Sequence, residues 1–83
     1  MDEIGRAILE HIVKEIAPGA GREAVAASRN LIADGYLDSL GLVSLLTFLR
    51  QALDVDVDED DLKPETFATI DTIAALAKEP SGA

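Results

Sequence analysis

The chain has 83 residues, which is the size of one small domain. It is 48% hydrophobic and 28% charged, which argues against disorder, and it has no cysteine, which excludes disulfides and thiolate metal sites. Its formal net charge of −9 argues against nucleic-acid binding. The charge favours partners with basic patches, and solubility alone explains it equally well.

The first predicted helix covers residues 4–16. Isoleucines recur here every four residues, a spacing typical of an apolar helix face. Glu10 and Lys14 form a favourable i,i+4 pair on the polar side. Ala17-Pro18-Gly19 ends the helix, because proline cannot continue it. The only histidine, His11, lies on this helix, and we expect it at the surface or at the boundary of the core.

Residues 20–38 predict a long, ordered loop. The alanine-rich stretch Arg22–Ser28 favours one or two helical turns, and Asp34-Gly35 is a turn signal. We expect Leu31 and Ile32 to hold the loop against the core, with Leu37 as a further candidate. Long loops inside compact domains tend to be functional or disordered, and these apolar anchors favour an ordered loop.

The second main helix is predicted from Ser39 to about Leu53. Leucines line one face at the three- and four-residue spacing of a helix, and more apolar residues lie beside them. The leucine stripe consists of Leu42, Leu45, Leu46, Leu49 and Leu53. The predicted exposed face consists of Gly41, Ser44, Thr47, Arg50 and Gln51.

Six of the sixteen acidic residues lie in the following segment, 54–61, which we expect to be an extended connection. Residues 60–63 predict a short helix before Pro64. The last helix begins near Thr69, a residue type that caps helix N-termini well, and Asp71 lies favourably in its first turn.

These elements predict an all-α fold: a small four-helix bundle with three long helices and one short one, and a long loop between the first two main helices. We expect a single domain over residues 1–78 and a flexible C-terminal tail over residues 79–83. The acidic N-terminus is unlike a signal peptide, and Arg50 and Asp54 bound the longest apolar run. We therefore expect a freestanding, monomeric cytoplasmic protein with no membrane span.

Residues 54–65 also have the length of a calcium-binding loop, with acids at positions one, three, five and twelve. However, Glu59 stands at the sixth position, where such loops need glycine, and Asp61 stands where an apolar residue packs. A solvated acidic connection explains the pattern better, with weak divalent-ion binding as an alternative. We expect no specific metal site.

Ser39 is the candidate functional residue. It lies where the loop gives way to an apolar helix, beside the positive end of the helix dipole, and a hydroxyl there suits attachment of an anionic group. The alternative role is an ordinary N-cap, which serine often fills, and Ser39 can serve in both roles.

Gly35-Tyr36-Leu37-Asp38-Ser39-Leu40 resembles the signature of acyl and peptidyl carrier proteins, in which Asp-Ser-Leu precedes a helix. Leu42-Val43 continue the apolar pattern that the family has after its serine. After a twelve-residue connection, residues 67–73 resemble the family's closing helix. The resemblance therefore covers nearly the whole domain in the same order.

The resemblance implies that Ser39 bears 4′-phosphopantetheine, transferred from coenzyme A by a phosphopantetheinyl transferase, and that Asp38 has a supporting role. The arm's thiol would then hold an acyl or aminoacyl cargo as a thioester. The chain itself would be a carrier and not an enzyme. The implied contacts for partner enzymes lie on the second main helix: Leu40, Val43, Ser44 and Thr47.

A serine hydrolase is the competing interpretation of Asp-Ser-Leu. The preceding residue is Leu37, where that hydrolase motif has glycine, and no Gly-x-Ser-x-Gly motif is present. The chain also lacks a domain that would hold a triad around His11. We therefore expect no catalytic residue.

The kind of carrier is indicated by the helix after Ser39. Carriers of bacterial fatty-acid synthesis typically have several acids there, but this chain has none between Asp38 and Asp54 and has Arg50 instead. This pattern resembles discrete aminoacyl, peptidyl or D-alanyl carriers, loaded by an adenylating ligase or acyltransferase and used by downstream synthase or condensing enzymes. We expect a role in natural-product biosynthesis. The alternatives are an acyl carrier of fatty-acid synthesis and, from another class, a non-covalent helical adaptor or calcium module.

Overall fold

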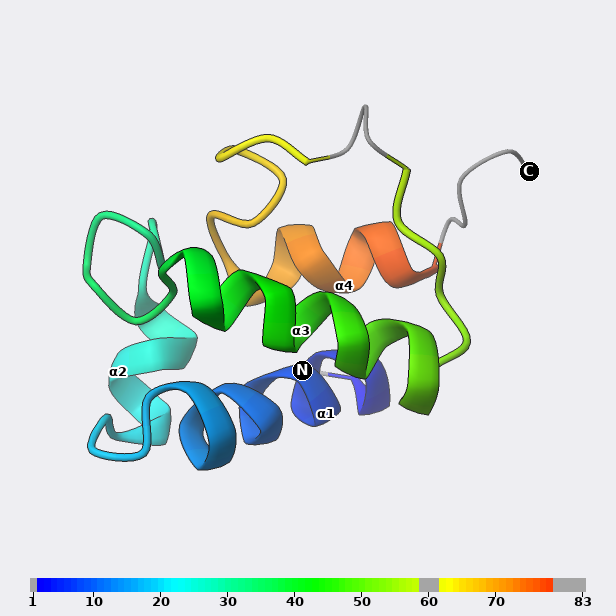
Figure 1. Ribbon diagram of the computed structural model, residues 1–83. Helices are drawn as coiled ribbons and strands as arrows, with labels where there is room; N and C mark the ends of the chain where they lie inside the picture. The colour runs from blue at the N-terminus through cyan, green and yellow to red at the C-terminus, as the bar shows by residue number, and fades with distance from the viewer. Residues whose placement is uncertain (1, 59–61, 79–83) are drawn as a thin grey trace.

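The computed structural model describes residues 2–58 and 62–78, and all regular structure in these residues is helical (Figure 1). The helices are α1 (Glu3–His11), its continuation η1 (Ile12–Ile16), α2 (Arg22–Ala27), α3 (Ser39–Ala52) and α4 (Ile70–Lys78). The three longer helices lie side by side, and α2 lies at one end of the bundle (Figure 1). The predicted all-α bundle, with one short helix, is confirmed.

The core is made of aliphatic side chains from all four helices and from the loops between them, together with one phenylalanine. Helix α1 packs most extensively against α4. Each fully buried aliphatic side chain contributes roughly 1.5–3 kcal/mol of hydrophobic free energy. The ten largest fully buried side chains are Phe67, Ile8, Ile12, Leu31, Leu37, Leu45, Leu49, Ile70, Ile73 and Val25.

The first helix changes its geometry at Ile12, where sequence alone predicts a regular helix. Ile12–Ile16 form a π-helical turn, in which the Ala17 amide donates to the Ile12 carbonyl over 2.7 Å. In an α-helix a four-residue repeat advances by about 40° per step around the axis. A π-helical turn contains more residues than an α-helical turn, so four residues make less than one full turn in η1. The π turn therefore rotates the next isoleucine back, against the advance of the α-helical part. The isoleucine stripe therefore continues to face its neighbours as far as Ile16, which packs against the core and lies beside the start of α3.

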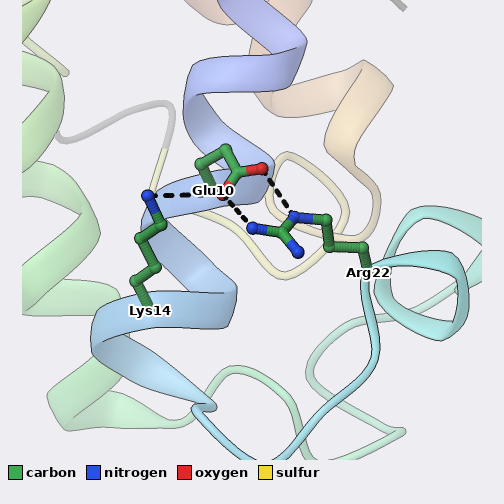
Figure 2. A network of polar contacts seen from close by, with 3 residues as sticks. All are labelled: Glu10, Lys14 and Arg22. Carbon is green, nitrogen blue, oxygen red and sulfur yellow. Dashed lines mark hydrogen bonds and ion pairs between the residues drawn. The ribbon is translucent and has the colours of Figure 1, made fainter.

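An ion-pair network joins α1 to the start of α2 (Figure 2). The Arg22 guanidinium donates to both carboxylate oxygens of Glu10, over 2.6 and 2.8 Å, and Lys14 Nζ lies 3.7 Å from the same carboxylate. These contacts lower the pKa of Glu10, chiefly through the hydrogen bond from Arg22, and raise the pKa of Arg22. The predicted Glu10–Lys14 pair is confirmed. The contact of Arg22 with Glu10 was not predicted, because the two residues are far apart in the sequence.

The long connection before α3 is ordered by its own polar side chains. The Ser28 hydroxyl donates to the Asp34 carboxylate over 2.5 Å, and the Asn30 side-chain oxygen accepts from the Ala33 amide over 3.0 Å. The Leu31 amide donates to the Ala68 carbonyl over 2.7 Å, which ties the connection to the segment before α4. The predicted turn contains Gly35 at a φ of 84°, in the left-handed region that favours glycine.

The apolar anchors of this connection differ from the prediction at one position. Leu31 and Leu37 are buried, as expected, but the Ile32 side chain is 39% exposed, so its assignment as an anchor is wrong. Around the turn at residues 31–35, Leu31 and Leu37 are buried in the core and Tyr36 packs against it partly buried, whereas Ile32 faces solvent.

Helix α3 ends where the chain turns sharply at Asp54. Asp54 has a φ of 56°, a left-handed conformation that aspartate tolerates better than most residues. The Leu53 and Val55 amides both donate to the Leu49 carbonyl, and Val55 is buried. Residues 55–58, where an extended connection is predicted, have no helix or strand.

The predicted short helix at residues 60–63 lies partly outside the described residues, and Leu62 and Lys63 are not helical. Thr69 precedes α4 as predicted, and its hydroxyl oxygen accepts from the Thr72 amide over 3.1 Å. The tail predicted over residues 79–83 lies outside the described residues. Among the helices described, none is long and apolar enough to cross a membrane.

Candidate functional site

Ser39 is the first residue of α3, and its side chain is exposed. The residue before it, Asp38, is the N-cap: its backbone is extended, and its carboxylate accepts from the Gly41 amide over 2.7 Å. Aspartate is among the best N-cap residues, because it satisfies an amide that has no partner within the helix and adds negative charge at the positive end of the dipole.

The capping role that the sequence left open for Ser39 therefore belongs to Asp38. Within residues 2–58 and 62–78, no hydrogen bond engages the Ser39 hydroxyl. The hydroxyl is accessible to a partner enzyme and holds no contact that a new bond would break.

Two backbone amides at the start of α3 remain available for an anion. The Gly41 amide is held by Asp38, and the Leu42 amide donates to the Asp38 carbonyl in the first helical hydrogen bond. Among the described residues, no acceptor pairs with the Ser39 or Leu40 amide. Such amides, together with the helix dipole, favour a phosphate group.

A groove of about 290 Å³ opens beside Ser39, between the long connection and the start of α3. Most of its lining side chains are apolar, and half-exposed Ile32 forms part of it. Its lining consists of Ile32, Gly35, Leu37, Asp38, Ser39 and Leu42. Ile32, which we expected in the core, therefore forms an apolar part of the wall of this groove.

The outer face of α3 is apolar and has no carboxylate. Leu40 is 82% exposed and Val43 is 62% exposed, and Thr47 is exposed as well. No acidic residue occurs in Ser39–Ala52, and Arg50 is the basic residue of the last turn. A second groove, of about 230 Å³, runs between this face and the connection after α3.

Two residues assigned to the exposed face of α3 are not exposed. Gly41 is buried against η1, and Ser44 is half-buried, with its hydroxyl 3.1 Å from His11 Nε2. Both assignments are wrong because α1 and η1 cover this flank of α3, which periodicity within α3 cannot reveal. Of the four predicted partner contacts, Leu40, Val43 and Thr47 lie on the open face, whereas Ser44 is engaged within the bundle.

His11 lies at the boundary of the core, as expected, and joins α1 to α3. Its ring stacks on Phe48, with 4.4 Å between centroids and 16° between planes. Burial lowers the pKa of His11, and the Glu15 carboxylate and the hydrogen bond to Ser44 partly oppose that shift. The histidine therefore pairs with Ser44 and not with Ser39, which leaves the hydrolase interpretation without its base. No pattern in the sequence predicts the contacts of His11 with Ser44 and Phe48.

No metal site is evident in the described part of the chain. Across residues 2–58 and 62–78, no three acidic or histidine side chains gather in a way that would hold a metal ion. Glu59 and Asp61, which decide the calcium interpretation, lie outside these residues.

Comparisons with known proteins agree on the kind of site. The family described as "Phosphopantetheine attachment site" matches residues 8–79. The chain is also 36% identical, over 53 residues, to an acyl carrier protein of Desulforapulum autotrophicum strain HRM2. That alignment covers 64% of this chain and 69% of the relative. No solved structure is significantly similar to this chain.

The division of roles at the start of α3 predicts effects of different size on stability for two adjacent substitutions. Asp38→Ala removes the N-cap and should lower the free energy of unfolding by about 1 kcal/mol. Ser39→Ala removes a hydroxyl without an internal partner and should change it by less than about 0.5 kcal/mol. Urea unfolding followed by circular dichroism measures both, with Asp38→Asn as the control that keeps a capping oxygen. A larger loss for Ser39→Ala than for Asp38→Ala would reverse the assignment.

The lowered pKa of His11 predicts that the stability of the fold depends on pH. Its pKa is lowered in the folded chain, so below about pH 6.5 the unfolded chain binds a proton more readily than the folded one. The free energy of unfolding should therefore fall as the pH drops below about 6.5, until the folded chain is protonated as well. Urea unfolding from about pH 7.5 to about pH 5.5 should show a smaller fall for His11→Gln than for the parent chain. If the free energy of unfolding of His11→Gln fell with pH as steeply as that of the parent chain, His11 would not be the source of the pH dependence.

Proposed function

Since the chain belongs to the carrier-protein family that has a phosphopantetheine attachment site, we propose that Ser39 is the residue that bears the group. Proteins of this family are carriers and not enzymes, and they hold 4′-phosphopantetheine through a covalent bond. The observation that carries the choice of residue is the exposed Ser39 hydroxyl at the start of α3, which no described residue engages.

The residues around Ser39 fit this group. Its phosphate would lie next to the Ser39 and Leu40 amides and the positive end of the α3 dipole. The groove beside Ser39 offers apolar surface to the part of the arm that follows the phosphate. When bound, the group supplies a terminal thiol that holds cargo as a thioester.

In the attachment reaction the chain supplies the nucleophile, and the transferase supplies the base. The Ser39 oxygen forms a bond to the phosphorus of the pantetheine phosphate in coenzyme A, the phosphoanhydride bond breaks, and adenosine 3′,5′-bisphosphate leaves. A base on the phosphopantetheinyl transferase takes the hydroxyl proton. Asp38 holds the first turn of α3 through the Gly41 amide, and its exposed carboxylate is available to the transferase and its metal ion.

The outer face of α3 is our proposed docking surface for partner enzymes. Leu40 and Val43 are the most exposed large apolar side chains among the described residues, and they lie within one helical turn of Ser39. Thr47 extends this surface along the helix. An apolar face of this kind gains affinity from desolvation, so docking on it should depend only weakly on salt. The partners that we propose are the transferase, a loading enzyme and downstream condensing enzymes.

Within the family, we propose a carrier of aminoacyl or acyl groups, loaded by an adenylating ligase and used in natural-product biosynthesis. The absence of carboxylates from α3, together with Arg50, supports this choice over a carrier of fatty-acid synthesis. Coenzyme A is an intracellular metabolite, and we therefore place this function in the cytoplasm.

The alternative is an acyl carrier protein of fatty-acid synthesis. The similarity to the acyl carrier protein of Desulforapulum autotrophicum strain HRM2 favours it. The net charge of −9 would also attract the basic surfaces of partner enzymes. The two roles differ in the loading enzyme and not in the chemistry at Ser39.

Attachment at Ser39 is tested by intact mass. After incubation with coenzyme A, magnesium and a promiscuous phosphopantetheinyl transferase, the chain should gain the mass of one phosphopantetheine group, and Ser39→Ala should gain none. Ser44→Ala is the matched control, because it removes another α3 hydroxyl and leaves Ser39 in place. A gain by Ser39→Ala, or no gain by the parent chain, would refute the assignment.

The choice of pathway is tested by loading the phosphopantetheinylated chain. We expect amino-acid adenylating ligases to form the thioester at a higher kcat/KM than the acyltransferases and ligases of fatty-acid synthesis. Mass spectrometry of the loaded chain measures both reactions. Equal or faster loading by the fatty-acid enzymes would favour the alternative and contradict our preferred role.

A further inference from the structure

Gly41, two residues after Ser39, lies where the bundle has no room for a side chain. A Cβ atom at this position would lie 2.6 Å from Cγ2 of Ile16. Non-bonded carbon atoms pack at about 3.5–4.0 Å, so any side chain larger than hydrogen must displace its neighbour. The start of α3 and the end of η1 therefore approach each other as closely as they do because residue 41 is glycine.

Ile16 has little freedom to move away from this contact. Its Cγ2 methyl is attached directly to Cβ, and β-branched side chains are stiff at χ1. Ile16 is also the last residue of η1, where the π turn and the hydrogen bond from the Ala17 amide to the Ile12 carbonyl set the backbone. The π turn thus places a rigid methyl group against the first turn of α3.

The same contact reaches the two residues that precede Ser39. The Cβ at position 41 would lie 3.2 Å from Oδ1 of Asp38, the oxygen that holds the Gly41 amide, and 3.5 Å from Cδ1 of buried Leu37. Ile16, the N-cap and the end of the long connection therefore meet at one point beneath Ser39. A displacement of Gly41 would move the cap and, with it, the attachment residue.

We propose that Ile16 and Gly41 are a positioning pair that sets where the first turn of α3, which carries Ser39, stands relative to the rest of the docking surface, Val43 and Thr47. The proposal rests on attachment at Ser39, because it concerns how that hydroxyl is presented to the transferase. Neither residue touches the reacting atoms. They act through the position of the first turn of α3, whose outer side chains make the contact with the enzyme.

The test is the steady-state rate of phosphopantetheine transfer from coenzyme A, with the chain as the varied substrate. Gly41→Ala should lower kcat by about tenfold to a hundredfold, because a displacement of about 1 Å in a reacting group costs that much, while KM changes little. Leu40→Ala should raise KM instead, because it removes a docking contact. Gly19→Ala is the matched control: it meets no atom within 4 Å and should keep both parameters.

A second variant, which removes the clash between residue 41 and Ile16, distinguishes a positioning role from a general loss of stability. In the double variant Ile16→Ala/Gly41→Ala the clashing methyl is gone, so kcat should recover most of the loss seen in Gly41→Ala, although a core side chain has been truncated. Thermal unfolding establishes that each variant is folded at the assay temperature. In the unmodified chain, exchange of the residue 41 amide with deuterium should be faster in Gly41→Ala than in the parent and slow again in the double variant.

An unchanged kcat in Gly41→Ala, or a double variant no faster than Gly41→Ala, would overturn the positioning role. These outcomes differ from failure of the proposed attachment, in which the parent chain itself would gain no phosphopantetheine or Ser39→Ala would gain it. The amide exchange needs no modification at all. It therefore reports on the Ile16–Gly41 contact even where attachment fails.

Discussion

The hydrogen bond from the Gly41 amide to the Asp38 carboxylate is the interaction on which the site depends. An α-helix begins with amides that have no partner inside the helix, and the residue before Ser39 satisfies one of them. Had Ser39 capped the helix, its hydroxyl would have been held by the backbone. Because Asp38 does so, the hydroxyl stays exposed, and the Ser39 and Leu40 amides stay available to an anion.

Helix α3 presents different surfaces to the bundle and to solvent. Leu45 and Leu49 are buried in the core, and the flank that carries Gly41 and Ser44 is covered by α1 and η1. The remaining side carries the exposed Leu40 and Val43. An apolar helix can therefore serve the core and a partner at once, because its neighbours cover only part of its circumference.

The long connection before α3 has a similar double role. Buried Leu31 and Leu37 hold it to the core, and the Ser28–Asp34 hydrogen bond and the left-handed Gly35 give it a defined shape. Ile32 is left half-exposed and becomes part of the wall of the groove beside Ser39. Order in this loop fixes the direction in which the chain enters Asp38 and Ser39.

Much of the fold, and the place of Ser39 at the start of a helix, could be predicted from local signals. Isoleucine and leucine spacing located α1 and α3, Pro18 marked the end of the first helix, and Thr69 the start of the last. Periodicity gives the apolar face of a helix but not which neighbour covers its flanks. For that reason Gly41 and Ser44 were assigned to the exposed face, and Ile32 to the core.

Local sequence patterns predict the helices, their order and the place of a serine at a helix start, because capping, proline breaks and apolar spacing act between residues close in the chain. Which of two adjacent residues caps α3 is also a local choice, and the structure shows that it is Asp38. The cover that α1 and η1 give to the flank of α3 with Gly41 and Ser44, and the close approach of Ile16 to Gly41, depend instead on contacts between segments distant in sequence. A distance of a few ångströms between two side chains is settled by packing, which no local pattern encodes.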